Sequence, residues 1–334
     1  MFISIICPVY NEEKYISQCI DSMLDQDIDK SEIELLFVDG MSKDNTRKIV
    51  SDYCSKFDFI HLLDNPDRIV PPALNLAIHA SKGDYIIRID AHCIYPKDYI
   101  SRLVYSAQQL GCDNIGAVCR TLPANESAKA KAIATAMSHK FGVGGSSFRI
   151  GSSEIKEVDT VPFGCFRRKI FDKLGFFDEE LIRNQDDEFN GRIIKNGGKI
   201  YLLPDLVVDY YARDSFKKLF KMFFQYGLFK PLVNKKLGSP ATLRQFFPLL
   251  FVLGLILGAA ICWIHPILTS IYISVVFIYL LLDLFFSIKS SHGVSNMFSL
   301  FWSFITMHIS YGWGYIVGIY KIIFGKPFIA KSNH

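Results

Sequence analysis

The C-terminal part of the chain contains three long stretches with very few charged side chains. Residues 246–264, 267–288 and 298–320 carry one charge among them. A bilayer core is crossed by a helix of about 20 apolar residues, so each stretch has the length and composition of a membrane span. The sequence therefore predicts a membrane domain at residues 246–324, with about three apolar spans, and a tail at residues 325–334.

Positive charge predicts how these spans are oriented. Lys and Arg collect in the cytoplasmic loops of membrane proteins, and four of them come just before the first stretch: Lys230, Lys235, Lys236 and Arg244. We therefore expect a multi-pass protein of the inner, cytoplasmic membrane with residues 1–245 in the cytoplasm. Three complete spans would place Lys326 and Lys331 outside, whereas a returning helix pair or a broken third helix would not. The sequence leaves these alternatives open.

A basic, amphipathic segment precedes the first span. In residues 214–230, five large apolar side chains recur at helical spacing with lysines between them: Phe216, Leu219, Phe220, Phe223 and Phe224. Such a helix typically lies in the membrane interface, although a surface helix packed on its own domain has the same pattern. Its position favours the first interpretation, so residues 213–245 are predicted to form an interfacial helix and a linker.

The first hundred residues alternate short apolar runs with helical patterns. The runs FISIICPVY, IELLFVDG, FIHLLDN and DYIIRIDAH have strand length, and the segments between them place apolar residues on one helical face. Such alternation predicts βα units, and strands buried in a parallel sheet give unbroken apolar runs of this kind. We therefore predict an α/β catalytic domain with a mostly parallel, Rossmann-like sheet at residues 1–212.

Polar residues follow three of the predicted strands. The first strand leads into residues 8–12, the second ends at Asp39, and the fourth ends at Asp90 and His92. Ligands of open α/β sheets bind outside the carboxyl ends of the strands. Neighbouring carboxylates repel one another there unless a metal ion, protein cations or hydrogen-bond donors are close. The sequence therefore predicts a ligand site at this edge.

Composition excludes several classes of partner. The net charge is only +4 and no nucleic-acid-binding motif is present, so no nucleic-acid partner is expected. The eight cysteines form no CxxC pair, which excludes a zinc ribbon and a thioredoxin-type site. Reduced thiols fit a catalytic domain in the cytoplasm. The oligomeric state cannot be inferred from these features.

Four motifs, CPVYNEE, VDGMSKDNT, RIDAH and RNQDDEFNGRI, follow one another within residues 1–230. In this order and spacing they resemble the family 2 glycosyltransferases, which have the GT-A fold. More narrowly, the chain resembles the membrane-anchored glucosyltransferases of the succinoglycan-biosynthesis type. That resemblance lies in DAH in place of DxD, VDTVPFGCFRR at residues 158–168, FGVGGSSFR at residues 141–149 and a late HxSYGxG pattern. It implies an inverting, metal-dependent transferase that uses a nucleotide-activated sugar.

The resemblance also implies a set of donor-binding residues. Asp39 would accept a hydrogen bond from a uracil imide, Pro8, Tyr10 and Glu12 would contact the base and ribose, and Arg68 would approach the nucleotide. Each assignment has a structural alternative. Asp39 would instead cap the turn before Gly40, and the PVYNEE segment would simply begin a helix with acidic residues in its first turn. Arg68 would instead be a surface cation.

Asp90 and His92 stand at the DxD position. The resemblance implies that Mg²⁺ or Mn²⁺ bridges Asp90 and the donor diphosphate, where it offsets the charge on the leaving group. Oxygen ligands suit Mg²⁺, and an imidazole makes Mn²⁺ easier to accommodate. His92 is a second metal ligand, a hydrogen-bond donor to phosphate or a structural histidine, and the sequence does not choose among these roles.

Asp186 aligns with the catalytic acidic motif of the family, in which Gln185 here replaces the usual Glu. By this resemblance, Asp186 takes the proton of the acceptor hydroxyl as it attacks the anomeric carbon. One base and a metal-assisted leaving group give a single displacement with inversion. Asp187 and Glu188 would orient the base or hold the acceptor. The structural alternative, an acidic first turn at a helix N-terminus, is compatible with catalysis.

Gln225 marks the position where processive polysaccharide synthases carry QxxRW. Leu228 and Phe229 replace the Arg and Trp, so the resemblance implies a non-processive enzyme, with Gln225 as a candidate acceptor contact. We expect a lipid-linked glycan acceptor, because membrane confinement raises its local concentration. Two alternatives remain open, namely transfer to polyprenyl phosphate itself and a non-catalytic membrane scaffold on a transferase fold.

Overall fold

The computed structural model describes residues 1–240, 242–291 and 293–328. Most of the predicted tail at residues 325–334, Lys331 included, lies outside the described residues.

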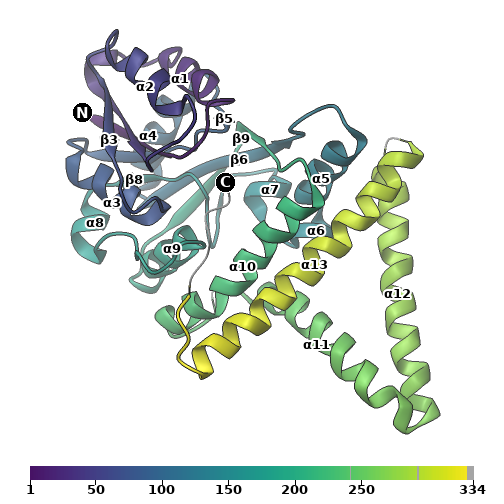
Figure 1. Ribbon diagram of the computed structural model, residues 1–334. Helices are drawn as coiled ribbons and strands as arrows, with labels where there is room; N and C mark the ends of the chain where they lie inside the picture. The colour runs from purple at the N-terminus through teal and green to yellow at the C-terminus, as the bar shows by residue number, and fades with distance from the viewer. Residues whose placement is uncertain (241, 292, 329–334) are drawn as a thin grey trace. The chain divides into compact units, whose positions relative to one another are not determined.

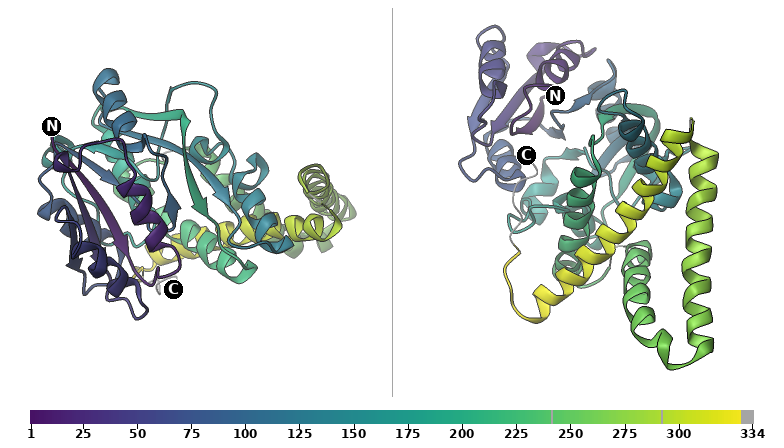
Figure 2. Two further views of the ribbon diagram at one scale, coloured as in Figure 1. Left: turned by 90° about the horizontal axis from the view of Figure 1, so that it is seen from above. Right: turned by 45° about the vertical axis from the view of Figure 1, so that its right-hand side comes forward.

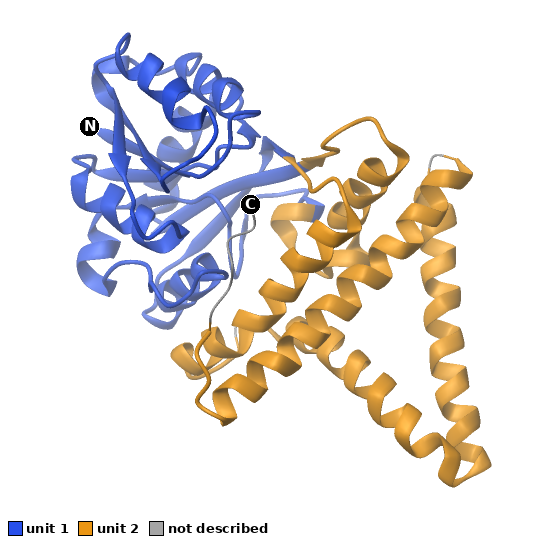
Figure 3. Cartoon of the chain, viewed as in Figure 1, with its two compact units in different colours: residues 1–120, 150–210, 334 blue, residues 121–149, 211–333 orange. Residues whose placement is uncertain are grey.

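The chain divides into two compact units, which Figure 3 shows in blue and orange. Unit 1 contains residues 1–120 and 150–210, and unit 2 contains residues 121–149 and 211–333. One segment of the predicted catalytic domain, residues 121–149, thus belongs to the same unit as the C-terminal helices. A boundary of this kind depends on contacts between distant parts of the chain, so composition along the chain does not reveal it.

A single mixed sheet forms the centre of unit 1 (Figure 1). Its strand order is β3-β2-β1-β4-β8-β6-β9-β5, with β7 paired to β9. The strands are β1 Ile3–Val9, β2 Ile33–Asp39, β3 Ile60–Asp64, β4 Tyr85–Arg88, β5 Cys93–Ile94, β6 Asn114–Leu122, β7 Lys156–Glu157, β8 Cys165–Arg167 and β9 Ile200–Tyr211. The predicted α/β fold is confirmed, and β1 to β4 are the four predicted strands, paired in parallel.

The sheet continues beyond the predicted parallel strands with antiparallel ones. β8 pairs with β4 and β6, while β5 and β7 pair with β9, all antiparallel. Three of these strands, β5, β7 and β8, have only two or three residues. A run that short has no readable alternation of apolar residues, because its pairing depends on the neighbouring strands.

The strand register brings the predicted site residues to one edge of the sheet. Val9 at the end of β1 lies opposite Asp39 at the end of β2, and Asp39 lies opposite Asp64 at the end of β3. β1 lies between β2 and β4, so the strand order reverses there, which is where open α/β sheets bind ligands. The helices of unit 1 are α1 Ile16–Leu24, α2 Thr46–Cys54, α3 Val70–Ala80, α4 Tyr99–Leu110, α8 Lys169–Leu174 and α9 Gln185–Lys195.

Unit 2 is helical, and Figure 2 shows α10 and α13 side by side. A Cβ on Gly314 of α13 would collide with the carbonyl oxygen of Phe224, and one on Gly227 of α10 with that of Tyr311. Glycine at these positions lets the two backbones touch, as at many close helix crossings. The helices of the unit are α5 Ala128–Ser138, α6 Lys140–Val143, α7 Ser147–Ile150, α10 Phe216–Leu237, α11 Phe246–Ile261, α12 Pro266–Ser290 and α13 Val294–Ile323.

Two helical segments in the described part of the chain are long and apolar enough to cross a membrane. They are Leu243–Ile264 and Pro266–Ser290, with mean hydropathies of 2.5 and 2.3 and mostly exposed side chains. The third predicted span falls within α13, which is long enough but less apolar. This helix buries polar side chains such as Ser303 and Ser310 inside its unit. The structure therefore supports two of the three predicted spans by length and hydropathy.

The predicted interfacial helix forms the first turns of α10. Its apolar face is largely buried within unit 2: Leu219 is 0% exposed and Phe223 is 8% exposed, although Phe220 is 42% exposed. The helix α10 packs chiefly on α13. Most of its apolar face therefore agrees with the alternative prediction, in which the helix packs within its own unit.

Candidate active site

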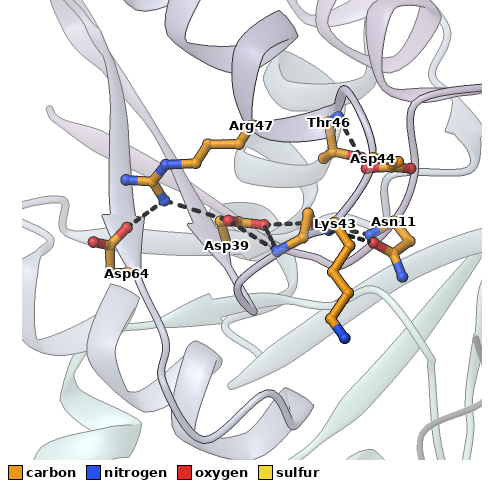
Figure 4. A network of polar contacts seen from close by, with 8 residues as sticks. Asn11, Asp39, Lys43, Asp44, Thr46, Arg47 and Asp64 are labelled. Carbon is orange, nitrogen blue, oxygen red and sulfur yellow. Dashed lines mark hydrogen bonds and ion pairs between the residues drawn. The ribbon is translucent and has the colours of Figure 1, made fainter.

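The carboxylate of Asp39 is fully buried at the end of β2. It accepts hydrogen bonds from the Ser42 hydroxyl at 2.6 Å and the Ser42 amide at 3.2 Å, and Arg47 Nη1 lies 3.3 Å away. The same Arg47 nitrogen is 2.5 Å from Asp64 Oδ1 at the end of β3, as Figure 4 shows. One guanidinium therefore bridges two neighbouring strand ends, which relieves the repulsion expected there. Because Asp39 accepts from Ser42, it also caps the turn that follows β2, which is the structural alternative predicted from the sequence.

The loops that follow β1 and β2 are hydrogen-bonded to each other. The Asn11 amide donates to Ser42 Oγ at 2.9 Å, and the Lys43 amide donates to Asn11 Oδ1 at 2.8 Å (Figure 4). The Glu12 amide donates to Thr46 Oγ1 at 2.7 Å. Asn11 has φ +55°, in the left-handed region that asparagine enters more readily than most non-glycine residues, and these hydrogen bonds hold its loop in place.

Tyr10, Asp39 and Arg68 come together around Gly40. A Cβ added to Gly40 would lie 3.4 Å from both the Arg68 Cα and the Tyr10 ring. The Asn65 amide donates to the Asp39 carbonyl oxygen at 2.8 Å, which joins the loop of Arg68 to β2. The Arg68 side chain is exposed, and Pro8 is half-buried in β1. The structure thus places these predicted donor-binding residues at one edge.

Asp90 and His92 lie just beyond β4. The Tyr95 hydroxyl accepts from the Asp90 amide at 2.7 Å and holds its backbone. His92 Nδ1 is 2.8 Å from Asp90 Oδ1 and 3.3 Å from Glu12 Oε1. Burial would raise the pKa of Asp90, but His92 and Arg88 outweigh it and hold this pKa well below its usual range. Burial likewise opposes the charged form of His92, yet the two carboxylates raise its pKa well above the ordinary value.

Asp90 can supply one carboxylate to a metal ion whose other ligands come from a substrate and water. The described residues contain no group of three or more His, Cys, Asp or Glu side chains that could hold a metal. Mg²⁺ is commonly bound through one or two carboxylates, several waters and substrate phosphates. Asp90, with a side chain 24% exposed, can supply such a carboxylate. The His92 Nδ1 atom faces the Asp90 and Glu12 carboxylates, so this nitrogen is engaged within the protein.

Asp186 lies in the first turn of α9, where the helix dipole favours acidic residues. Its Oδ1 atom pairs with Arg88 Nη1. Burial raises the pKa of Asp186 to about 6; Arg88 opposes this shift, while Asp187 and Asp90 add to it. A carboxyl group with this pKa can accept a proton near neutral pH.

The other candidate residues have different surroundings. Glu188 is 3% exposed and lies 2.7 Å from Arg192 Nε; Arg192 also donates to the carbonyl oxygens of Leu174 and Phe176. Glu188 thus belongs to a buried cluster that ties α8 to α9. Asp187 is half-buried beside Asp186. Gln225 is buried in α10 and belongs to unit 2.

Two cations of this region had no predicted role. Arg47 bridges Asp39 and Asp64, and Arg88 pairs with Asp186. A detectable signal existed for Arg88, since it interrupts the apolar run YIIRI and a buried charge needs a partner. The partner itself, 98 positions further along the chain, had no local signal.

Comparison with known proteins identifies the class of protein. The family described as glycosyl transferase family 2 matches residues 4–175. A relative from Methanococcus voltae, dolichyl N-acetyl-alpha-D-glucosaminyl phosphate 3-beta-D-2,3-diacetamido-2,3-dideoxy-beta-D-glucuronosyltransferase, is 34% identical over 70% of this chain and 74% of its own. Succinoglycan biosynthesis protein ExoA from Rhizobium meliloti (strain 1021) is 32% identical over 73% of this chain and 74% of its own. The chain belongs to glycosyltransferase family 2 and is a glycosyltransferase.

Solved structures support the fold. The crystal structure of S. aureus TarS 1-349 matches with a TM-score of 0.53 and 20% identity, over 71% of this chain and 65% of that one, slightly less than two thirds. The same protein in complex with UDP-GlcNAc matches with a TM-score of 0.50 and 15% identity, over 98% of this chain and 93% of that one. At these identities the likeness shows a common GT-A-like fold.

Proposed function

We propose that this enzyme transfers one sugar from a UDP-sugar to a lipid-linked glycan, with inversion at the anomeric carbon. The observation that carries the proposal is the half-buried Asp186 carboxylate, which pairs with Arg88 and interacts electrostatically with Asp90. A proton acceptor and a candidate donor ligand therefore lie close together at the reversal of the strand order.

The donor would bind across the ends of β1, β2 and β4. Asp39 would accept a hydrogen bond from the uracil, while Pro8, Tyr10, Glu12 and Arg68 would surround the base and ribose. The shared surroundings of Gly40 support this grouping. The complex of TarS with UDP-GlcNAc, a protein of the same fold, also supports a nucleotide-sugar donor.

Asp90 would hold the diphosphate end of the donor together with Mg²⁺ or Mn²⁺. When bound, the ion would offset the negative charge that develops on the leaving diphosphate. The position of His92 between Asp90 and Glu12 supports a hydrogen-bonding role and disfavours ligation through Nδ1. His92 would then keep the Asp90 carboxylate oriented and ionised.

Asp186 would accept the proton of the acceptor hydroxyl at its carboxylate. Oxygen attack and departure of the nucleoside diphosphate in one displacement invert the anomeric centre. Asp187, which follows in the same helical turn, would help to orient the acceptor. A base near pKa 6 suits a sugar hydroxyl, whereas a polyprenyl phosphate is already ionised and has less need of one.

The acceptor would be held at a membrane. The name of the Methanococcus voltae relative describes transfer to a dolichyl phosphate-linked sugar, and ExoA is named for succinoglycan synthesis. Two helical segments with mean hydropathies of 2.5 and 2.3 would anchor the enzyme in the bilayer. We place the catalytic unit on the cytoplasmic side, because Lys and Arg precede the first of these segments.

The test is donor turnover by the full chain purified in detergent. UDP-glucose, UDP-galactose, UDP-N-acetylglucosamine and GDP-mannose are incubated with Mn²⁺, Mg²⁺ or EDTA, and the released nucleotide is measured. We expect slow, metal-dependent hydrolysis of one UDP-sugar, lost in Asp186→Asn but kept in the matched Asp172→Asn, which changes an exposed carboxylate of α8. Well-folded protein that neither hydrolyses nor binds any of these donors would contradict the proposal.

A further inference from the structure

Arg88 is a buried cation to which the motifs assign no function. It is the last residue of β4, is 5% exposed, and its guanidinium lies 5.8 Å from the centre of the Phe163 ring. Its Nη1 atom pairs with Asp186, whereas Nε has no hydrogen-bond partner in the part of the chain that the structure describes. A buried cation without an ionic partner is strongly destabilising, so this pair keeps Arg88 in the interior.

The backbone of Arg88 is held from both sides. Its amide donates to the Gly164 carbonyl oxygen at 3.0 Å, and the next amide, of Ile89, donates to Ile6 at 2.9 Å. Arg88 and Asp90 stand two positions apart and attract each other electrostatically. The segment that carries the candidate donor-binding residue Asp90 therefore also carries the cation that contacts Asp186.

We infer that Arg88 is a positioning residue, which holds the Asp186 carboxylate in place at the donor end of β4. This inference rests on the proposed role of Asp186. The charged groups that act on Asp186 are Arg88 and Asp90 from the β4 side and Asp187 on its own helix. Two of them are negative, so Arg88 is the group that offsets both this repulsion and the effect of burial. A planar guanidinium also fixes the direction of a carboxylate better than an ammonium group does.

The experiment compares Arg88→Lys and Arg88→Met with wild type and with Arg192→Lys, a matched change in another arginine–carboxylate pair on α9. Metal-dependent UDP release from UDP-glucose and UDP-N-acetylglucosamine is followed from about pH 5 to about pH 8, with UDP binding measured by calorimetry. For Arg88→Met we expect kcat to fall about 10- to 100-fold with donor KM within about threefold. The acid limb of kcat should move to higher pH.

Arg88→Lys should restore part of the rate and part of the pH profile, because it keeps the charge but loses the planar geometry. Arg192→Lys should lower the melting temperature without moving the acid limb. An unmoved acid limb in Arg88→Met, or an equal movement in Arg192→Lys, would overturn the inference. If Arg88→Met does not fold, the acid limb of Arg88→Lys is compared with that of wild type. A shift to higher pH supports the inference, and an unmoved limb overturns it.

Failure of this inference is distinguishable from failure of the proposed function. Wild-type protein that turns over a donor and loses this activity in Asp186→Asn, but not in the Arg88 variants, rejects only the positioning role. Full activity in Asp186→Asn rejects the base assignment and the inference together.

Discussion

The two compact units of this chain differ sharply in charge. Unit 1 contains 21 Lys and Arg and 30 Asp and Glu, whereas unit 2 contains 16 Lys and Arg and only three acidic residues. The net charge of +4 for the whole chain hides a balance of −9 and +13. An acidic unit suits the proposed site, where a divalent cation would hold the donor diphosphate. A basic and apolar unit suits the surface of a membrane with anionic lipids.

The units also treat partly or fully buried carboxylates differently. In unit 1, Arg47 lies beside Asp39, and Arg88 pairs with Asp186. In unit 2, Asp283 is fully buried in α12, where its Oδ1 accepts from the Ser287 hydroxyl at 3.1 Å. Its Oδ2 has no hydrogen-bond partner among the described residues. Unit 1 thus places cations beside these negative carboxylates. Unit 2 contains few acidic residues, so it has few negative charges that need a cation.

The largest expected effect belongs to the chemistry of unit 1. Asp186→Asn should lower metal-dependent donor turnover about 10²- to 10⁴-fold, because the amide cannot take the acceptor proton. UDP binding by calorimetry should stay within about threefold of wild type, since the base does not hold the nucleotide. Equal losses in Asp187→Asn would show that any acidic residue of this helical turn serves, and would reject the specific assignment.

The next effect concerns the basic surface of unit 2. Lys217, Lys218 and Lys235 are exposed on α10, and a lysine near an anionic bilayer contributes about 1 kcal/mol. Changing all three to Gln should weaken binding of fluorescent phosphatidylglycerol in detergent by up to about 100-fold, and added salt should do the same. The matched control changes Lys48, Lys56 and Lys82 of unit 1 to Gln. Equal weakening of lipid binding in the control variant would show that the basic surface of unit 2 has no special part in binding anionic lipid.

The close crossing of α10 and α13 gives a smaller effect on stability. Gly314→Ala should destabilise the protein by about 1–3 kcal/mol, because the new Cβ meets the Phe224 carbonyl oxygen. Gly254→Ala is the control, since a Cβ at Gly254 of α11 meets nothing within 4 Å. There the higher helix propensity of Ala should leave stability unchanged or raise it by up to about 1 kcal/mol. Thermal unfolding in detergent measures the stability of both variants. Equal melting temperatures of Gly314→Ala and Gly254→Ala would contradict the close contact of α10 with α13 at Gly314.

The smallest effect is the acid limb of the pH–rate profile. The raised pKa of Asp186 lies near 6, and the base must be ionised, so kcat should rise with pH through about 6. At pH 5 the rate should be about tenfold below its plateau, and a bound divalent cation would move the limb lower by favouring the carboxylate. Steady-state UDP release in a constant-ionic-strength buffer measures the profile. A limb centred above about pH 7 would indicate a different titrating group.

Local patterns in the sequence account for much of the fold and for part of the site. The runs of β1 to β4 are mostly apolar, and acidic residues come where these runs end, so the parallel sheet and its candidate ligand edge were predictable. The two candidate spans that contain α11 and α12 follow from composition alone, because hydropathy is a property of neighbouring residues. The motifs at Asp39, Asp90 and Asp186 were sufficient to suggest the family.

The tertiary structure decided what depends on residues far apart in the chain. It paired Arg88 with Asp186, placed His92 between Asp90 and Glu12, and added antiparallel strands too short to show a period. It also buries one face of α13, so that this long hydrophobic stretch packs against other helices of unit 2. The burial of these side chains and the Arg88–Asp186 pair arise only when distant segments meet. The sequence alone therefore determined the class of fold and the candidate residues, while only the tertiary structure determined which charge acts on which.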